Sequence, residues 1–256
     1  MEAGKLFDLS GKLALVTGAG SGLGKRFALT LARAGATLAL AARRREPLEA
    51  TASAIHAAGG AAHCVPLDVA AADSVESAFQ ALEPLGVVDI VVNNAGVAGV
   101  GSLLDTTEDT WNAVLEVNLK GPWLVARAAA RRMISHSRRG SIINVASVLG
   151  SAVQKGTANY PASKAALLHL TRSMALEWAR YGIRVNALAP GYFMTELSGG
   201  FLDSEAGRAM LKRMPFRRLG EPVELDGALL LLASDASSYM TGSVIAVDGG
   251  LSVPTI

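Results

Sequence analysis

The sequence predicts an α/β fold in which a doubly wound, seven-stranded parallel sheet carries helices on both faces. Short apolar runs alternate along the chain with amphipathic or alanine-rich stretches of helical length, which is the order of right-handed βαβ units. Most of these runs are almost continuously hydrophobic, as expected of strands that are buried on both faces. The expected strands are Leu13–Thr17, Thr37–Ala41, Ala62–Leu67, Asp89–Val92, Ser141–Ala146, Arg184–Leu188 and Ser243–Val247.

The chain is expected to form one domain over residues 1–256, since it contains no Pro/Ser-rich linker, low-complexity tract or fixed-period repeat. The segment 193–217 departs from the strand–helix alternation because it is polar, contains glycine and is rich in methionine. We expect this segment to be a substrate loop or lid inserted between two strand–helix units.

Composition excludes several classes of function. The chain has 24 Lys and Arg against 22 Asp and Glu, a net charge of +2, so nucleic acid is not an expected partner. The one cysteine, Cys64, allows no intrachain disulfide, which favours a reducing compartment. The first residues lack the pattern of a signal peptide, and no apolar run is long enough to span a membrane, so a cytoplasmic location is expected. The four histidines show no metal-ligand spacing, so no metal site is expected.

A glycine-rich turn follows the first expected strand and opens the first expected helix. It reads Thr17-Gly18-Ala19-Gly20-Ser21-Gly22-Leu23-Gly24. Glycines permit a tight turn and a close approach of backbone N–H groups to a pyrophosphate, and the helix N-terminus adds its positive dipole end. We therefore expect Gly18, Ser21, Gly22, Leu23 and Gly24 to bind a dinucleotide.

The spacing Gly-x-x-x-Gly-x-Gly resembles the cofactor turn of the short-chain dehydrogenase/reductase family, and further motifs follow in that family's order. They are Asn93-Asn94-Ala95-Gly96, Asn118, Ser147, Tyr160-Pro-Ala-Ser-Lys164, Pro190-Gly191 with Thr195, and Asp248-Gly249-Gly250. The resemblance covers nearly the whole chain and implies a single-domain Rossmann fold with an NAD(P)-dependent oxidoreductase activity.

The expected catalytic residues are chemically coherent. Tyr160 and Lys164 lie four residues apart in an expected helix and so share one face. A neighbouring ammonium group favours phenolate, so we expect Lys164 to lower the pKa of Tyr160. Tyr160 can then exchange a proton with a carbonyl or alcohol oxygen, while Ser147 donates a hydrogen bond to that oxygen.

Other roles are implied by the resemblance. Lys164 and Tyr160 would also contact the cofactor, with Lys164 holding the nicotinamide ribose, and Asn118 would support a water relay from Lys164 to solvent. Asp68 and Val69 would contact the adenine. The remaining cofactor contacts would be Asn94, Gly96, Pro190, Gly191, Phe193 and Thr195.

NADP(H) is favoured over NAD(H). NAD enzymes place an acidic residue after the second strand to bind the ribose 2′-hydroxyl, whereas this chain has Ala42 there. Arg43 follows and is expected to pair with a 2′-phosphate, with Arg44 as a helper.

The favoured function is therefore hydride transfer between a nicotinamide and a small carbonyl or secondary-alcohol substrate, and the alternative is a cofactor-binding sensor or scaffold without turnover. The sequence resembles both the 3-oxoacyl-thioester reductase and the gluconate 5-dehydrogenase-like branches, which leaves the substrate open. The loop 148–159 and the segment 193–217 are expected to flank the nicotinamide. The family resemblance also implies a homotetramer assembled through the expected helices Glu108–Ser135 and Asn159–Arg180 and the last strand. Arginines near the end of the first of these helices, among them Arg132 and Arg138, are interpreted as a solvated face.

Overall fold

The computed structural model describes residues 3–194 and 205–253, and it contains a seven-stranded sheet in which every strand pairing is parallel. The strands are β1 (Leu13–Thr17), β2 (Thr37–Ala42), β3 (Ala62–Pro66), β4 (Ile90–Asn93), β5 (Gly140–Val145), β6 (Ile183–Pro190) and β7 (Val244–Val247). Their order in the sheet is β3-β2-β1-β4-β5-β6-β7. The predicted fold class is confirmed.

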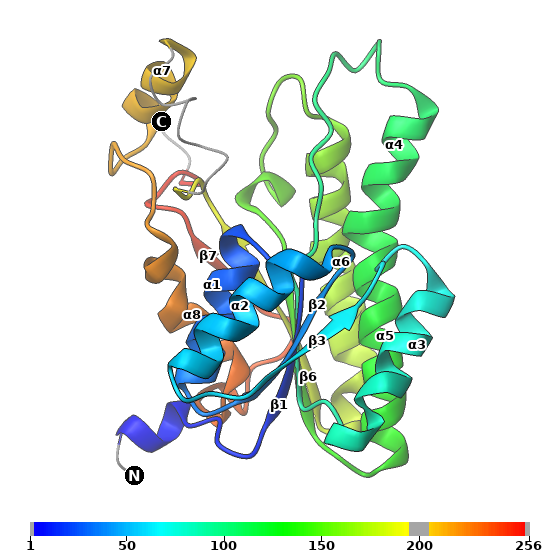
Figure 1. The fold of residues 1–256 in the computed structure, drawn as a ribbon. Coiled ribbons are helices and arrows are strands. Elements are labelled where there is room, and N and C mark those ends of the chain that lie inside the picture. The colour runs from blue at the N-terminus through cyan, green and yellow to red at the C-terminus, as the bar shows by residue number, and fades with distance from the viewer. Residues whose placement is uncertain (1–2, 195–204, 254–256) are drawn as a thin grey trace.

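Helices cover both faces of the sheet (Figure 1). They are α1 (Gly22–Arg33), α2 (Arg45–Ala57), α3 (Ala72–Leu82), α4 (Glu108–Leu115), α5 (Gly121–Ser135), α6 (Asn159–Trp178), α7 (Glu205–Arg213) and α8 (Asp226–Ala233). Helices α1, α2 and α8 cover one face, and α3, α5 and α6 cover the other. The two layers follow from the alternation of side chains along each strand, because Leu15 packs against the α5 layer and its neighbour Val16 against the α1 layer.

The expected helix Glu108–Ser135 is present, but it is not α-helical throughout. Thr107 caps the start of α4, since its hydroxyl oxygen accepts a hydrogen bond of 3.2 Å from the backbone N–H of Thr110. A π-helical turn, Glu116–Lys120, then joins α4 to α5. Pro122 has no N–H and therefore cannot donate to the carbonyl oxygen of Asn118, as an α-helix would require at this place. The proline thus accounts for a local break in the α-helical pattern at Asn118.

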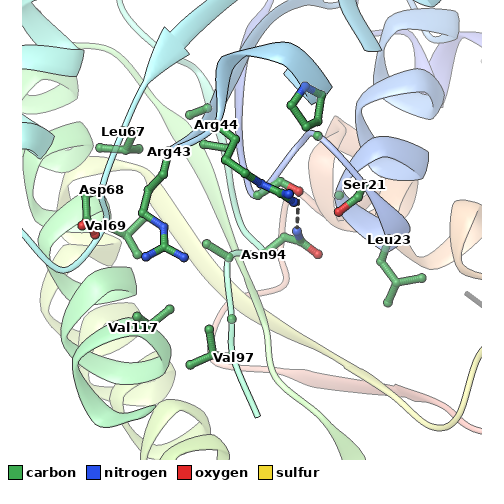
Figure 2. A pocket seen from close by; sticks show the side chains of 18 residues that line it. Ser21, Leu23, Arg43, Arg44, Leu67, Asp68, Val69, Asn94, Val97 and Val117 are labelled. Carbon is green, nitrogen blue, oxygen red and sulfur yellow. Dashed lines mark hydrogen bonds between the residues drawn. The ribbon is translucent and has the colours of Figure 1, made fainter. Parts of the chain in front are cut away.

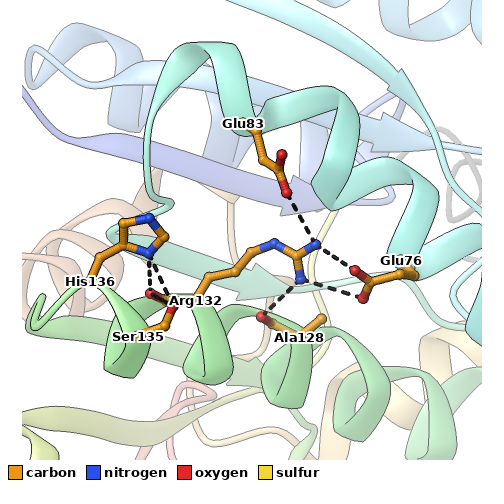
Figure 3. Close-up of polar contacts among 6 residues, drawn as sticks. All are labelled: Glu76, Glu83, Ala128, Arg132, Ser135 and His136. Atoms are coloured by element: carbon orange, nitrogen blue, oxygen red, sulfur yellow. Dashed lines mark hydrogen bonds and ion pairs between the residues drawn. The ribbon is translucent and has the colours of Figure 1, made fainter.

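Arg132 joins α5 to α3, as Figure 3 shows. Its guanidinium lies 2.6 Å from a carboxylate oxygen of Glu76 and 3.7 Å from one of Glu83, and it stacks over the Phe79 ring at 5.1 Å from the centroid. Only 19% of the Arg132 side chain is exposed. Arg138 pairs at 2.8 Å with the buried Asp89. The interpretation as a solvated face is therefore wrong for Arg132, which is mostly covered by α3, whereas the Arg138 side chain is 50% exposed.

Candidate active site

A polar cleft lies at the carboxyl edge of the sheet beside β1 and β4, the two neighbours at which the strand order reverses. Crossovers to either side of this point lead away from each other, which leaves room for a ligand. The cleft has a volume of about 320 Å³. It is lined by Gly18, Gly20, Ser21, Leu23, Gly24, Ala41, Ala42, Arg43, Arg44, Pro47, Leu67, Asp68, Val69, Asn94, Ala95, Gly96, Val97 and Val117 (Figure 2).

The glycine-rich turn forms one wall of this cleft. Gly18 has a φ of +67°, a conformation that side chains with a Cβ rarely adopt. Gly24 lies so close to the turn that a Cβ on it would stand 2.1 Å from the carbonyl oxygen of Gly18. Ser21 immediately precedes α1, and within the described residues its side chain does not cap the helix. The first N–H groups of α1 are therefore left for an anion at this helix end.

Asn94 fastens the glycine-rich turn to the end of β4. Its Nδ2 donates hydrogen bonds to the carbonyl oxygens of Thr17 at 2.9 Å and Gly18 at 3.4 Å. The Thr17 hydroxyl oxygen in turn accepts from the backbone N–H groups of Asn94 and Ala95, each at 3.0 Å. Asn94 thus shapes the turn as well as lining the cleft, a structural part that the sequence analysis did not assign to it.

Arg43 and Arg44 follow β2 and extend into the cleft (Figure 2). Both side chains are exposed, and in the part of the chain that the structure describes neither forms an ion pair with a carboxylate. Arg45, by contrast, pairs with Glu49 at 2.7 Å on the exposed side of α2. Two cationic groups with free donors at the cleft can bind a phosphate.

Asp68 and Val69 form the opposite wall of the cleft. The Asp68 carboxylate accepts a hydrogen bond of 3.0 Å from the backbone N–H of Ala70, and the Ser74 hydroxyl accepts one of 2.9 Å from the backbone N–H of Asp68. These bonds fix the loop after β3. Val69 is buried, and its side chain is so close to Gly121 that a Cβ there would lie 2.8 Å from it.

Tyr160 and Lys164 share one face of α6, as expected. The Lys164 Nζ lies 5.6 Å from the centroid of the Tyr160 ring and donates a hydrogen bond of 2.8 Å to the carbonyl oxygen of Val145, the last residue of β5. Lys164 is buried, and burial lowers the pKa of its ammonium group to about 8.

Ser147 follows β5 and approaches Tyr160. Its side-chain hydrogen bond with Tyr160 lowers the pKa of the phenol, but the larger effect is burial, which raises that pKa above its usual value of 10.0. The expected lowering by Lys164 is therefore wrong for the protein by itself, because desolvation of the phenol dominates. Ser147 also accepts a hydrogen bond of 3.1 Å from the backbone N–H of Leu149 and so caps the turn Val148–Gly150.

Asn118 lies in the π-helical turn and is completely buried. Its side chain pairs with the backbone of Val97, accepting from the N–H and donating to the carbonyl oxygen, each at 2.8 Å. It also donates at 3.1 Å to the hydroxyl of Ser163, which lies next to Lys164 in α6. A Cβ on Gly96 would stand 3.3 Å from the Asn118 Oδ1 and 3.7 Å from the Lys164 Nζ. Asn118 and Lys164 are thus close neighbours of Gly96, which lines the cleft.

Comparison with known proteins identifies the family. Residues 18–252 match the family described as enoyl-(acyl carrier protein) reductase. The chain is 40% identical to gluconate 5-dehydrogenase of Gluconobacter oxydans strain 621H over 97% of both chains. The chain belongs to the short-chain dehydrogenase/reductase family. Its membership makes it an oxidoreductase of that family.

Other members of the short-chain dehydrogenase/reductase family are equally similar over their whole length. The 3-oxoacyl-acyl-carrier-protein reductase of Thermotoga maritima is 39% identical over 95% of this chain and 98% of its own. A crystal structure of gluconate 5-dehydrogenase from Burkholderia cenocepacia J2315, in complex with NADP and tartrate, is 41% identical, has a TM-score of 0.94 and covers 99% of this chain and 100% of that one. The names of these relatives represent both branches that the sequence resembles, the 3-oxoacyl-thioester reductases and the gluconate 5-dehydrogenases.

Four further predicted cofactor residues of this short-chain dehydrogenase/reductase, namely Gly22, Pro190, Gly191 and Phe193, are not among the residues that line the cleft. Gly22 opens α1 with a φ of +51°. Pro190 ends β6, and the N–H of Gly191 donates at 2.9 Å to the carbonyl oxygen of Val247 in β7. Phe193 is buried, and a Cβ on Gly220 would lie 2.5 Å from its ring. Thr195 lies outside the described residues.

Several lining residues were not expected from the sequence. They are Gly20, Ala41, Pro47, Leu67, Ala95, Val97 and Val117. Most are small or apolar, so nothing in their chemistry separates them from core residues. Val97 and Val117 do adjoin expected site residues in the sequence, namely Gly96 and Asn118, and that adjacency was the available signal.

Within residues 3–194 and 205–253, no three His, Cys, Asp or Glu side chains are grouped so as to hold a metal ion. Over those same ranges, every helix is too short or too polar to cross a membrane.

Proposed function

We propose that this protein is an NADP(H)-dependent dehydrogenase/reductase that interconverts a carbonyl compound and a secondary alcohol. The observation that carries the proposal is the gathering of the Ser147 and Tyr160 side chains beside the buried Lys164, which lies close to Gly96 in the lining of the cleft. A cofactor that binds in that cleft supplies or accepts the hydride. The same gathering makes a purely cofactor-binding sensor the weaker alternative, because a sensor needs no acid or base.

Tyr160 is the proposed acid and base. Its high pKa keeps the phenol protonated near neutral pH, so it is ready to give a proton to a carbonyl oxygen. In the oxidative direction it must take a proton from an alcohol, and there the ammonium group of Lys164 favours the phenolate. Ser147 donates a hydrogen bond to the same substrate oxygen as negative charge develops on it.

Lys164 and Asn118 are proposed to serve the proton path and the cofactor. The hydrogen bond to Val145 uses one of the three donors of the Lys164 ammonium group, and the others are left for Tyr160 and the nicotinamide ribose. Asn118 holds the Val97 backbone and the π-helical turn in place. We expect the carbonyl oxygen of Asn118, which Pro122 leaves without its α-helical donor, to bind a water molecule of that path.

The cofactor-binding residues are proposed to be those of the cleft together with Gly22, Pro190, Gly191, Phe193 and Thr195. The pyrophosphate would lie at the glycine-rich turn and the start of α1. The adenosine would lie between the Asp68–Val69 wall and the end of β2. Preference for NADP(H) is supported by the free guanidinium groups of Arg43 and Arg44, and by Ala42 where an acidic residue would repel a phosphate.

We also propose that the chain is a single domain with a substrate loop at 193–217, that it acts in the cytoplasm and that it forms a homotetramer. Exposed apolar side chains on the long helices support the assembly, with Leu176 at 84% and Trp123 at 38% exposure. Static light scattering at micromolar concentration checks the assembly, and a mass of one chain would contradict it.

The test of the function is a turnover assay with NADPH and NADH. Oxidation of each cofactor is followed with diketones, sugar-acid ketones and 3-ketoacyl thioesters, since relatives carry names from both the sugar-acid and the acyl-thioester branches. We expect Tyr160→Phe to lower kcat by about 10²- to 10⁴-fold, the usual contribution of a general acid, and to leave the Kd of NADPH nearly unchanged. Tyr181→Phe, on the exposed end of the α6 region, is the matched control. Cofactor binding without turnover on the whole panel would favour the sensor instead.

A further inference from the structure

A hydrogen bond of 2.8 Å joins the Tyr192 hydroxyl, which donates, to the Oε1 of Gln154. Gln154 belongs to the loop between Ser147 and α6, and Tyr192 follows the end of β6. Tyr192 is near enough to Tyr160 for its negative form to raise the pKa of the Tyr160 phenol. The pair therefore links the two segments beside the proposed acid.

Local hydrogen bonds fix the backbone on both sides of the pair, near Gln154 and at Tyr192. The carbonyl oxygen of Gly156 accepts a hydrogen bond of 3.0 Å from the N–H of Gly101, and the Thr157 hydroxyl donates at 3.3 Å to the carbonyl oxygen of Gln154. On the other side, the carbonyl oxygen of Tyr192 accepts at 2.9 Å from the N–H of Gly220. These bonds fix the backbone from which the two side chains extend. The pair can therefore present its polar groups in one arrangement.

Within residues 3–194 and 205–253, the Gln154 side-chain amide and the Tyr192 hydroxyl form no other hydrogen bond, so the pair has unused hydrogen-bonding capacity of both kinds. With Oε1 engaged by Tyr192, the free end of the Gln154 amide is the Nε2 group, which carries two donors. The Tyr192 oxygen keeps its lone pairs and can accept. An alcohol hydroxyl is at once a donor and an acceptor, so it satisfies both groups, whereas an alkyl or acyl chain satisfies neither and removes water from them at a cost.

We propose that Gln154 and Tyr192 are specificity-determining residues that recognise a hydroxyl group near the reacting carbonyl, so that the preferred substrates are polyhydroxylated ketones and their alcohols. The inference deepens the proposed function and rests on it. The alternative hypothesis is that this hydrogen bond only holds the segments of Gln154 and Tyr192 together and contacts no substrate. In that case its removal would affect every substrate alike.

The experiment compares two ketones of equal chain length, one with hydroxyl groups on the carbons next to the carbonyl and one without. The variants are Tyr192→Phe, which removes only the hydroxyl, and Gln154→Leu, which keeps the size of the side chain. Tyr181→Phe and Gln80→Leu are the matched controls, since both residues are surface-exposed on helical segments away from the cleft. Steady-state kinetics with the reduced cofactor gives kcat/KM for each pair.

We expect each variant to lower kcat/KM for the hydroxylated ketone about tenfold, the usual effect of one lost hydrogen bond, while kcat/KM for the plain ketone is unchanged or higher. The double variant should lose little more than either single one, because the two side chains act as a unit. Equal losses on both ketones, or no loss on either, would overturn the inference while leaving the proposed function intact.

A wild-type preference for the plain ketone would also overturn the inference. If the wild type reduces neither these ketones nor any other member of the substrate panel, the proposed function fails and this inference falls with it. Tyr160→Phe separates the two cases, since it must lower kcat about 10²- to 10⁴-fold on both ketones if the proposed function holds.

Discussion

The ammonium group of Lys164, in the second turn of α6, donates a hydrogen bond to the main-chain carbonyl oxygen of Val145 at the end of β5, with 2.8 Å between the two atoms. This bond ties α6 to the carboxyl edge of the sheet and fixes the charge beside the Tyr160 ring. Burial disfavours the charged form of Lys164 and lowers its pKa from 10.5 to about 8. Holding the charged ammonium group in this place therefore costs folding free energy.

The first prediction concerns stability against pH. Below pH 8 Lys164 is charged in both the folded and the unfolded chain, so the burial cost is fully present. Between about pH 8 and 10.5 the unfolded chain binds the proton that the folded chain has lost, so the contribution of Lys164 to the free energy of unfolding rises with pH. The gain across that window is on the order of 3 kcal/mol.

Urea unfolding of the wild type and of Lys164→Met, each at about pH 7.5 and about pH 10, measures this gain. The free energy of unfolding of the wild type minus that of the variant should be larger at the higher pH, since the methionine does not titrate. A difference that is the same at both would show that burial does not shift this lysine.

The second prediction concerns Gly24. Gly24→Ala places a Cβ 2.1 Å from the carbonyl oxygen of Gly18, so the turn and the start of α1 must separate. We expect a loss of stability of about 1–3 kcal/mol, the range for overpacking, together with weaker binding of NADPH. Gly227→Ala is the control, because a Cβ at this position in α8 meets nothing within 4 Å and the helix gains about 0.5–1 kcal/mol. Thermal unfolding and fluorescence titration with NADPH measure both effects, and tight NADPH binding by Gly24→Ala would disprove the tight approach.

The third prediction separates the two nicotinamide cofactors. Arg43→Gln removes a charged donor from the cleft, so the Kd of NADPH should rise about 10- to 100-fold, as for other lost hydrogen bonds to charged groups, with little change for NADH. Arg45→Gln, two residues further on and paired with Glu49, should alter neither Kd. Adding Ala42→Asp should shift the preference further toward NAD. Unchanged NADPH affinity in Arg43→Gln would assign the phosphate to another group.

The fourth prediction concerns the ion pairs that Arg132 of α5 forms with Glu76 and Glu83. Arg132→Ala leaves Glu76 and Glu83 without their cation and uncovers the Phe79 ring, so the free energy of unfolding should fall by about 1–2 kcal/mol. Arg45→Ala breaks an exposed pair and should cost no more than about 0.5 kcal/mol. Chemical denaturation measures both, and NADPH affinity should stay constant. Equal effects of the two variants would show that the Arg132 cluster is no stronger than a surface pair.

Much of the fold could be predicted because its signals are local. The strand β1 has the bounds expected from its apolar run, and the other strands differ by one or two residues at their ends. The glycine-rich turn was placed correctly because strand, turn and helix are consecutive in the sequence. Even Asn118 was located in the long helix, although the π-helical turn around it was missed. That turn depends on Pro122 and on packing against Val97, which periodicity does not register.

The parts of the site that were missed depend on contacts between distant segments. The pKa of Tyr160 was expected to fall because Lys164 is close in sequence, but the burial that raises it comes from the whole fold. Asn94 was expected at the cofactor and does line the cleft, but its bonds to Thr17 and Gly18, which also make it a part of the turn, were not foreseen. The Gln154–Tyr192 pair had no signal at all, since a glutamine in a loop and a tyrosine after a strand are ordinary residues apart from each other.

The reversal of strand order between β1 and β4 divides the work of the site along the chain. The arginines that face the proposed phosphate follow β2, whereas Ser147, Gln154 and Tyr192 all come after β5. We therefore expect substitutions that alter which ketone is accepted to need no compensation at Arg43, and a change of cofactor preference at Arg43 to leave the proposed substrate residues intact. Descendants of this protein could therefore change their substrate through the segments of Gln154 and Tyr192, both in the second half of the chain, and keep the first half unaltered.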